Sequence, residues 1–213
     1  MKRHKIYPDI KQYIAGLEDD FKSISAERKS SLEALSDYLI ETVDDSGYSK
    51  LTFICTHNSR RSHIAQIWAH TFSMYYEMED IFCFSGGTES TELHPNAIEA
   101  LKKSGFRISD DGSKNNPRYR VQVGDKIPDL ICFSKQLVEP PNPESDFCAV
   151  MVCSDADEKC PVVKGAEKRI SMPYDDPRHF DGTTEQKQKY AERVFEIGRD
   201  IMWAFDRASA KLR

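Results

Sequence analysis

The sequence has no long hydrophobic run. Its longest apolar stretches are short, as at residues 148–153, whereas a helix that spans a membrane needs about 20 apolar residues. Residues 1–14 are basic at first, but they contain neither an apolar core nor a cleavage site, so no signal peptide is expected. No membrane partner is expected either, and the default expectation is a cytoplasmic protein.

The sequence also lacks an excess of positive charge. Its 30 Lys and Arg are outnumbered by 35 Asp and Glu, which gives a formal net charge of -5. This balance argues against binding to nucleic acid over a broad surface, but it is compatible with one local anion site. With 213 residues, of which 39% are hydrophobic, the chain is long enough for one well-cored domain plus an extension.

A disulfide framework is not expected. The chain has 6 cysteines, but it shows no export signal and is large enough to fold without cross-links. The sequence has no close ligand pairs of the kind that indicate a zinc site. Three cysteines lie inside apolar stretches and are interpreted as small buried hydrophobes, namely Cys83, Cys132 and Cys148. The other three lie where an apolar stretch meets a polar one, namely Cys55, Cys153 and Cys160.

Residues 8–44 have the apolar spacing of amphipathic helices. Ile10, Ile14 and Leu17 recur at helical intervals, and leucines continue the pattern further along the chain. A run of Asp, Ser and Gly then ends it. We therefore expect residues 1–48 to form a helical extension of two helices, packed on the main domain or on a second subunit.

After this extension, short apolar runs alternate with helical patterns. The apolar runs predict strands at residues 51–54, 81–84, 147–152 and 169–172. The amphipathic patterns predict helices at residues 63–78 and 95–104 and from near Thr183. Strands that alternate with helices form parallel sheets covered on both faces. The predicted fold class is α/β, a doubly wound domain over residues 49–213 with a four-stranded parallel core sheet.

Residues 117–145 interrupt this alternation. Residues 119–123 alternate like a half-buried strand, the Gly-Asp-Lys that follows can turn the chain, and residues 130–133 are apolar. These pieces predict a β-hairpin insertion. The alternative is that residues 130–133 join the core sheet as a parallel strand, which their unbroken apolar character allows.

The stretch that carries chemistry follows the first predicted strand and begins with Cys55. A loop between a strand and a helix points backbone N–H groups at one place, and the helix N-terminus adds positive potential, so a tetrahedral oxyanion fits there. The same field favours the thiolate form of Cys55, which is a nucleophile. Arg61 can hold two oxyanion oxygens, and Ser62 can donate a hydrogen bond to the sulfur. The remaining residues predicted to bind substrate lie between them, namely Thr56, His57, Asn58, Ser59 and Arg60.

A leaving oxygen must take up a proton, and Asp176 is a candidate acid on a loop. The alternative interpretation of residues 175–177 is a simple turn, and the alternative for Cys55 is a free cysteine before a basic helix start. Asn58, which tolerates the left-handed backbone of a tight loop, and Ser62 favour the oxyanion site. Together these residues predict thiolate attack on phosphate or arsenate.

The loop that starts at Cys55 resembles the phosphate-binding loop of two enzyme groups that share a fold, the low-molecular-weight protein tyrosine phosphatases and the thioredoxin-coupled arsenate reductases. The resemblance covers most of residues 50–205 and includes residues 85–89 and 94–97. It implies that Asp176 is the general acid.

Three positions depart from the family pattern. Glycine is common where His57 stands, and a small residue or cysteine is common where Arg60 stands. Many reductases carry glutamate where Gln66 stands, so the resemblance gives no support for a bound potassium ion. No metal site is predicted.

Cys153 and Cys160 resemble the redox segment of the reductases. Cys153 ends the third predicted core strand and Cys55 the first, so neighbouring strands would bring both sulfurs to one edge of the sheet. The resemblance implies that Cys55 forms an adduct with arsenate, that Cys153 attacks Cys55 and releases arsenite, and that Cys160 then takes over the disulfide. The polar residues between Cys153 and Cys160 are expected to be flexible. Residues 178–180 match poorly the aromatic pair that tyrosine phosphatases carry there.

The predicted function is therefore arsenate reduction through Cys55, Cys153 and Cys160, with thioredoxin as the external reductant and no tightly bound cofactor. The runner-up is a hydrolase of phosphomonoesters that uses Cys55, Arg61 and Asp176. A hypothesis of another class is a non-catalytic protein that binds an oxyanion or a protein partner.

Overall fold

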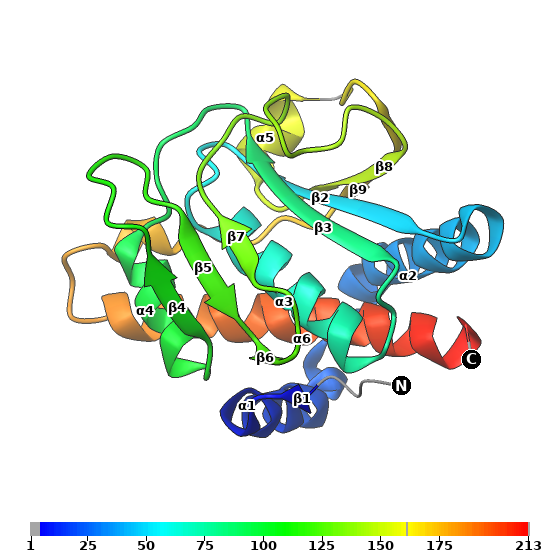
Figure 1. Cartoon of the computed structure of the whole chain (residues 1–213), viewed down its shortest axis with the longest axis horizontal. Helices are drawn as coiled ribbons and strands as arrows, with labels where there is room; N and C mark the ends of the chain where they lie inside the picture. Colours follow the sequence, from blue (N-terminus) through cyan, green and yellow to red (C-terminus); the bar gives the residue numbers. More distant parts are fainter. Residues whose placement is uncertain (1–4, 161, 213) are drawn as a thin grey trace.

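The computed structural model describes residues 5–160 and 162–212. Its centre is a sheet of four parallel strands in the order β3-β2-β8-β9 (Figure 1). The strands are β2 (Ser49–Cys55), β3 (Ile81–Gly87), β8 (Phe147–Met151) and β9 (Ala166–Ser171). The predicted parallel core sheet is confirmed, and each of its four strands overlaps the segment predicted for it.

Helices flank this sheet. They are α3 (Arg61–Tyr75), α4 (Pro95–Lys103), α5 (Ser154–Lys159) and α6 (Gln186–Leu212). α3 packs directly on β2 and β3, and α6 packs along α3 on the side away from the sheet (Figure 1). Within the described residues, no helix is long and apolar enough to span a bilayer.

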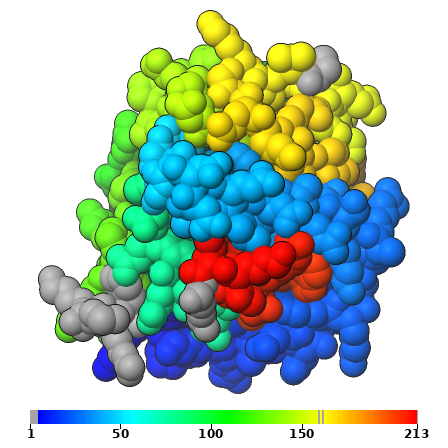
Figure 2. Space-filling model, turned by 90° about the vertical axis from the view of Figure 1, so that its right-hand side faces the viewer, coloured from blue at the N-terminus to red at the C-terminus, as the bar shows by residue number. Residues whose placement is uncertain are grey.

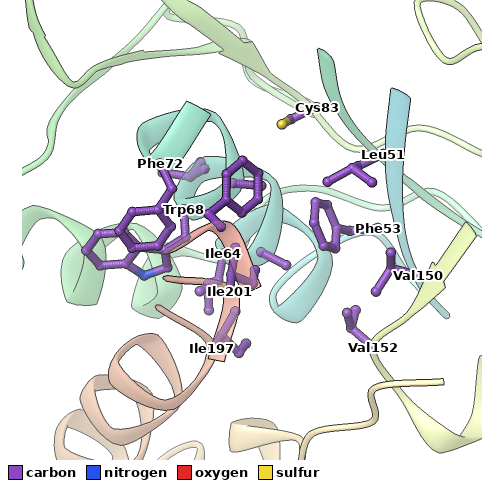
Figure 3. Close-up of a cluster of buried hydrophobic side chains, with 14 of the residues drawn as sticks. Leu51, Phe53, Ile64, Trp68, Phe72, Cys83, Val150, Val152, Ile197 and Ile201 are labelled. Carbon is purple, nitrogen blue, oxygen red and sulfur yellow. The ribbon is translucent and has the colours of Figure 1, made fainter. Parts of the chain in front are cut away.

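The core lies between the sheet and this pair of helices. Figure 3 shows Phe53 of β2 facing the side chains of α3 and α6, with Trp68 and Phe72 stacked on each other at a centroid distance of 5.3 Å. Gly198 allows α6 to approach closely, because a Cβ at that position would lie 2.8 Å from Cε2 of Trp68. The indole N–H of Trp68 donates to the carbonyl of Val194 at 3.0 Å, so this buried polar group is satisfied.

The N-terminal part forms α1 (Pro8–Asp19), a 3₁₀ turn (Phe21–Ser23) and α2 (Ala26–Ser46), as the apolar spacing predicts. Ser25 caps α2 by accepting a hydrogen bond from the Arg28 N–H at 3.1 Å. Gly47 ends the helix in the left-handed conformation, with φ of 75°. α2 and the C-terminal end of α6 lie side by side in Figure 2, so the apolar faces of the N-terminal helices belong to the common core.

The predicted hairpin is present as part of a larger antiparallel sheet. β5 (Tyr119–Gln122) pairs with β7 (Leu130–Cys132), and β4 (Arg107–Asp110) adds a third strand. The alternative that residues 130–133 join the core sheet is wrong. Between β5 and β7, β6 (Gly124–Asp125) pairs with β1 (Lys5–Ile6), which ties the insertion to the N-terminal part.

The segment between Cys153 and Cys160 differs from its prediction, because it forms the short helix α5 instead of an irregular loop. The Cys153 sulfur accepts a hydrogen bond from the Ala156 N–H at 3.4 Å, where a hydroxyl or carboxylate cap usually stands. Asp155 and Asp157 lie in the first turn, where negative charge favours a helix.

Candidate active site

The loop after β2 is held by the side chain of Asn58. This residue has a φ of 44°, the left-handed conformation expected of it. Its amide nitrogen donates to the Ser62 hydroxyl at 2.9 Å, and its amide oxygen accepts from the Lys135 N–H at 2.9 Å. Asn58 therefore links the loop to the first turn of α3 and to the end of the insertion.

Cys55 stands at the end of β2 and is 4% exposed. Its sulfur lies 3.1 Å from the Ser62 hydroxyl oxygen. Because Asn58 already donates to that oxygen, the hydroxyl hydrogen is free to point at the sulfur. This geometry suits a thiolate, which accepts the hydrogen bond.

Arg61 links the loop to the segment that carries the candidate acid. Its Nη2 donates to the Asp176 carboxylate at 2.6 Å, and its Nη1 donates to the Tyr174 carbonyl at 2.8 Å. Its Nε is buried, and no hydrogen-bond partner for it exists among residues 5–160 and 162–212. A buried N–H without a partner costs free energy, and an oxyanion bound beside Cys55 would supply one.

Arg61 and Asp176 line a polar cleft of about 260 Å³, whereas Cys55, Asn58 and Ser62 are not among its lining residues. Thr56, His57 and Arg61 contribute to its lining from the loop and the start of α3, and Asp176 contributes from the segment after β9. Several further lining residues were not predicted from the sequence, namely Ser154, Asp155, Tyr174, Asp175, Arg178 and His179. Of these, Arg178 had a signal in the sequence, because a cation two residues after the candidate acid adds to the field of an anion site.

Two residues of the loop that were predicted to bind substrate have side chains engaged elsewhere. The Ser59 hydroxyl donates to the Glu92 carbonyl at 2.7 Å. Arg60 donates through Nε to the Tyr190 hydroxyl at 2.7 Å and through Nη2 to the Asp181 carboxylate at 3.1 Å. The side chain of Arg60 therefore anchors the loop to the start of α6.

A buried network lies behind the loop. The Ser85 hydroxyl donates to the amide oxygen of Gln66 at 2.6 Å and lies 3.3 Å from Nδ1 of His63. Burial lowers the pKa of His63 to about 3, and the charge of Lys135 adds to that shift. Burial also lowers the pKa of Lys135 to about 8.

This network does not suit a potassium ion. The amide of Gln66 is neutral and is already paired, since its nitrogen donates to the Cys83 carbonyl at 3.0 Å. The Lys135 ammonium supplies a positive charge nearby, which would repel a bound cation. In the part of the chain that is described, no group of three or more His, Cys, Asp or Glu side chains could hold a metal ion.

The redox candidates Cys55 and Cys153 follow adjacent parallel strands. β2 pairs with β8 in a register that sets Ile54 opposite Met151, so both cysteines lie at the carboxyl edge of the sheet, as predicted. The Cys153 sulfur is fully buried and lies 3.5 Å from the Thr56 hydroxyl. Cys153 is therefore adjacent to the first residue of the loop.

Cys160 is separated from Cys153 by the length of α5. A helix rises about 1.5 Å per residue, so their Cα atoms are roughly 10 Å apart, beyond the ~7 Å limit for a disulfide. A bond between these two cysteines therefore requires α5 to unwind. Asp157 holds the helix, because it accepts hydrogen bonds from Arg169 and Ser171 at 2.6 Å each.

These features define a cysteine-based oxyanion site on an α/β fold of the low-molecular-weight phosphatase type. The solved structure of a low-molecular-weight phosphotyrosine phosphatase from Vibrio cholerae O395 has the same fold. It superposes with a TM-score of 0.52 at 12% sequence identity and covers 77% of this chain and 98% of the phosphatase. No protein-family model matches the chain.

Curated relatives define the family more closely. The arsenate reductase of Bacillus subtilis strain 168 is 33% identical over 150 residues, which cover 70% of this chain and 89% of the relative. Arsenate reductase 2 of Staphylococcus saprophyticus is 34% identical over 154 residues, which cover 72% of this chain and 94% of the relative. The chain belongs to the arsenate reductase family, so the predicted resemblance is confirmed.

Proposed function

We propose that this protein reduces arsenate with Cys55, Cys153 and Cys160 and is itself reduced by a protein dithiol of the thioredoxin class. The observation that carries the proposal is the position of Cys55 and Cys153 at the ends of adjacent strands, with Cys160 at the far end of α5. A cysteine pair supplies two electrons, so the reaction needs no tightly bound cofactor. The relay requires reduced thiols, which fits the cytoplasm.

In the first step the Cys55 thiolate attacks the arsenic of arsenate, an S–As bond forms, and one As–O bond breaks. Arg61 holds the oxyanion, with its unpartnered Nε as a free donor. Asp176 is the general acid in this proposal and gives a proton to the departing hydroxyl, which leaves as water. The hydrogen bond from Arg61 Nη2 holds the Asp176 side chain beside the oxyanion.

In the second step the Cys153 thiolate attacks the Cys55 sulfur. An S–S bond forms and the S–As bond breaks, and the electron pair of that bond stays on arsenic. Arsenic is thereby reduced from the +5 to the +3 state and leaves as arsenite, while the two cysteines are oxidised to a disulfide.

In the third step Cys160 attacks the Cys153 sulfur, and Cys55 leaves as a thiolate, ready for another substrate. The new disulfide joins Cys153 and Cys160, so α5 must unwind as it forms. A protein dithiol then reduces this disulfide by thiol–disulfide exchange and is itself oxidised. Two electrons and two protons thereby return to Cys153 and Cys160.

A second function is supported by the cleft alone. Cys55, Arg61 and Asp176 suffice to hydrolyse a phosphomonoester through a phosphocysteine, since water can replace Cys153 as the second nucleophile. Neither Cys153 nor Cys160 takes part in that reaction. The third hypothesis, a non-catalytic oxyanion-binding or partner-binding protein, requires that the Cys55 thiol alkylates no faster than a simple thiol.

One assay separates the first two functions. NADPH oxidation that depends on arsenate is measured with thioredoxin and its reductase, for the wild type and for Cys153→Ser. We expect turnover by the wild type and none by Cys153→Ser, with Cys83→Ala as an active control because Cys83 lies outside the cleft. A wild type that is inactive here but hydrolyses aryl phosphates would establish the phosphatase instead.

A further inference from the structure

A groove of about 260 Å³ lies beside the active-site loop, separate from the polar cleft. Its lining includes Gly87, which accepts and donates backbone hydrogen bonds at the end of β3. Leu137 and Val138 of the insertion line it, together with Cys160 and Val162, which follow α5. The groove therefore contains the one cysteine of the proposed relay that is partly exposed.

Exposed apolar side chains gather at this groove. Val138 is 81% exposed and Val162 is 84% exposed, whereas the next most exposed large apolar side chain in the described ranges, Phe82, reaches 48%. Both valines line the same groove, although they come from different segments of the chain. Apolar side chains that project into water around a functional group are typical of a protein-binding surface.

The side of the groove that comes from the insertion is held in place by backbone hydrogen bonds. The Gly87 N–H donates to the Lys135 carbonyl at 3.0 Å, and the Leu137 N–H donates to the Gly87 carbonyl at 2.9 Å. Gly86 permits this approach, since a Cβ there would lie 2.8 Å from Cα of Leu137. The Asn142 amide also donates to the Leu137 carbonyl at 3.2 Å. The groove is therefore preformed on this side.

We propose that this groove is the docking site of the protein dithiol that reduces the enzyme, a proposal that rests on the proposed function. The partner that must touch the Cys160 sulfur is the reductant, because Cys160 is partly exposed whereas Cys153 is fully buried. Val138 and Val162 contact the apolar surface around the partner's reactive thiol. The insertion thus has a role, which is to supply one side of the docking site.

The exchange in the groove conserves atoms and electrons. A thiolate of the partner attacks the Cys160 sulfur, a mixed disulfide forms, the Cys153–Cys160 bond breaks, and Cys153 leaves as a thiolate that takes up a proton. The second thiol of the partner then attacks its own sulfur in the mixed disulfide, and Cys160 leaves as a thiol. Two electrons pass from the partner to the enzyme.

The test compares a protein reductant with a small one. Arsenate reduction is measured against thioredoxin concentration and, separately, with dithiothreitol, for the wild type, Val138→Asp and Val162→Asp. Both substitutions are at exposed positions, so the fold is retained, which thermal melting checks. We expect the KM for thioredoxin to rise by roughly tenfold in each variant, whereas turnover with dithiothreitol stays within about twofold of the wild type.

Ile131→Asp is the matched control, because Ile131 is an exposed apolar residue of the same insertion, 41% exposed, and does not line the groove. With Ile131→Asp, thioredoxin and dithiothreitol should each be as effective as they are with the wild type. If both valine variants keep the wild-type KM for thioredoxin while Cys160→Ser still blocks turnover, the docking site is wrong and the relay stands. If the wild type reduces arsenate with neither reductant, the proposed function is lost and the docking site with it.

Discussion

Two hollows at the carboxyl edge of the sheet differ in chemistry. The cleft is charged and polar, with Arg61 and Asp176 in its lining, whereas the groove is apolar, with Val138 and Val162 projecting into water. A small oxyanion needs few, well-placed donors, while a protein partner needs apolar area. In the proposed scheme the same strand ends therefore serve a small substrate in one hollow and a large partner in the other.

The two hollows also differ in which parts of the chain build them. The loop after β2 and the segment after β9 supply most of the cleft. The groove adds residues of the insertion and those that follow α5. Cys153 is buried at the adjoining strand end, and in the proposed relay it passes the oxidation from Cys55 to Cys160. The comparison therefore predicts that damage to the cleft stops the chemistry, whereas damage to the groove stops only the recovery of the enzyme.

The largest expected effects are those of replacing Cys55, the nucleophile, and Cys160, the last cysteine of the proposed relay, and the two losses should differ in kind. Cys55→Ser should lose more than ~10⁴-fold in arsenate reduction and in any phosphatase activity, because a serine hydroxyl is a poor nucleophile here. Cys160→Ser should release about one arsenite per enzyme in a single turnover and then stop, because the Cys55–Cys153 disulfide cannot be passed on. Rapid-quench measurement of arsenite checks both.

Multiple turnover by Cys160→Ser with thioredoxin would contradict the division of roles between the cleft and the groove. It would mean that the reductant attacks the Cys55–Cys153 disulfide directly, through the cleft. Cys148→Ala is a control, since Cys148 is a buried cysteine of β8 outside both hollows.

The next effect concerns the acid. Asp176→Asn keeps a side chain of the same shape but cannot donate the proton, so the rate of adduct formation should fall by ~10²–10⁴-fold. The reduction of a Cys153–Cys160 disulfide by thioredoxin should be unchanged, because Asp176 does not line the groove. Stopped-flow fluorescence follows that step on its own. An equal loss in both steps would mean that the variant disturbs the fold and not the acid.

The cleft was largely predictable from the sequence because its main parts are local. The left-handed Asn58 and the pairing of Ser62 with the Cys55 sulfur occur within one short loop. The adjacency of Cys55 and Cys153 follows from the order of parallel strands, which alternation of strands and helices predicts. Arg60 was not predictable in this way, because its partners Tyr190 and Asp181 lie 130 and 121 residues further along the chain.

The groove was not predictable from the sequence, because it is recognised only by the solvent exposure of its apolar side chains. Nothing in the sequence distinguishes Val138 and Val162 from buried valines. β4 was missed because Arg107–Asp110 is largely exposed and shows no apolar alternation. α5 was missed because its cap is the sulfur of Cys153, which is not a usual capping group.

A smaller effect tests whether the N-terminal helices support the cleft. Arg28 of α2 donates to the Pro173 carbonyl, lies 4.6 Å over the Tyr174 ring and pairs with Asp200 at 3.4 Å. These contacts hold the segment that leads to Asp176, so Arg28→Met should lower the rate of adduct formation roughly three- to tenfold by misplacing the acid. The docking KM for thioredoxin should not change.

Arg207→Met is the matched control, because Arg207 of α6 forms an ion pair with Asp37 on the surface. Surface ion pairs contribute about 0–1 kcal/mol, so this variant should keep its activity. If Arg28→Met raises the KM for thioredoxin instead of slowing the adduct, the N-terminal helices support the groove and not the cleft.

The last prediction concerns the buried network behind the loop. Its expected effect is on the stability of the fold and not on activity. Burial lowers the pKa of His63 to about 3 in the folded protein, whereas in the unfolded chain it stays near the ordinary value of about 6.5. Between these values the unfolded state binds the proton and the folded state does not, so the free energy of unfolding falls as the pH is lowered. From pH 7 to pH 5 this contribution should fall by about 2 kcal/mol.

The measurement is urea unfolding at both pH values for the wild type and for His63→Gln. The variant removes this titration and keeps the others, including that of His94, whose pKa burial also lowers. The wild type should therefore lose about 2 kcal/mol more than the variant on acidification. Equal losses would mean that His63 is protonated in the folded protein, and the positive charge of Lys135 would then have to be shielded by a group beside the loop. In that case a protonated His63 would add a positive charge to the network behind the cleft. The charged character of the cleft would then continue into the core behind it, in contrast to the apolar groove.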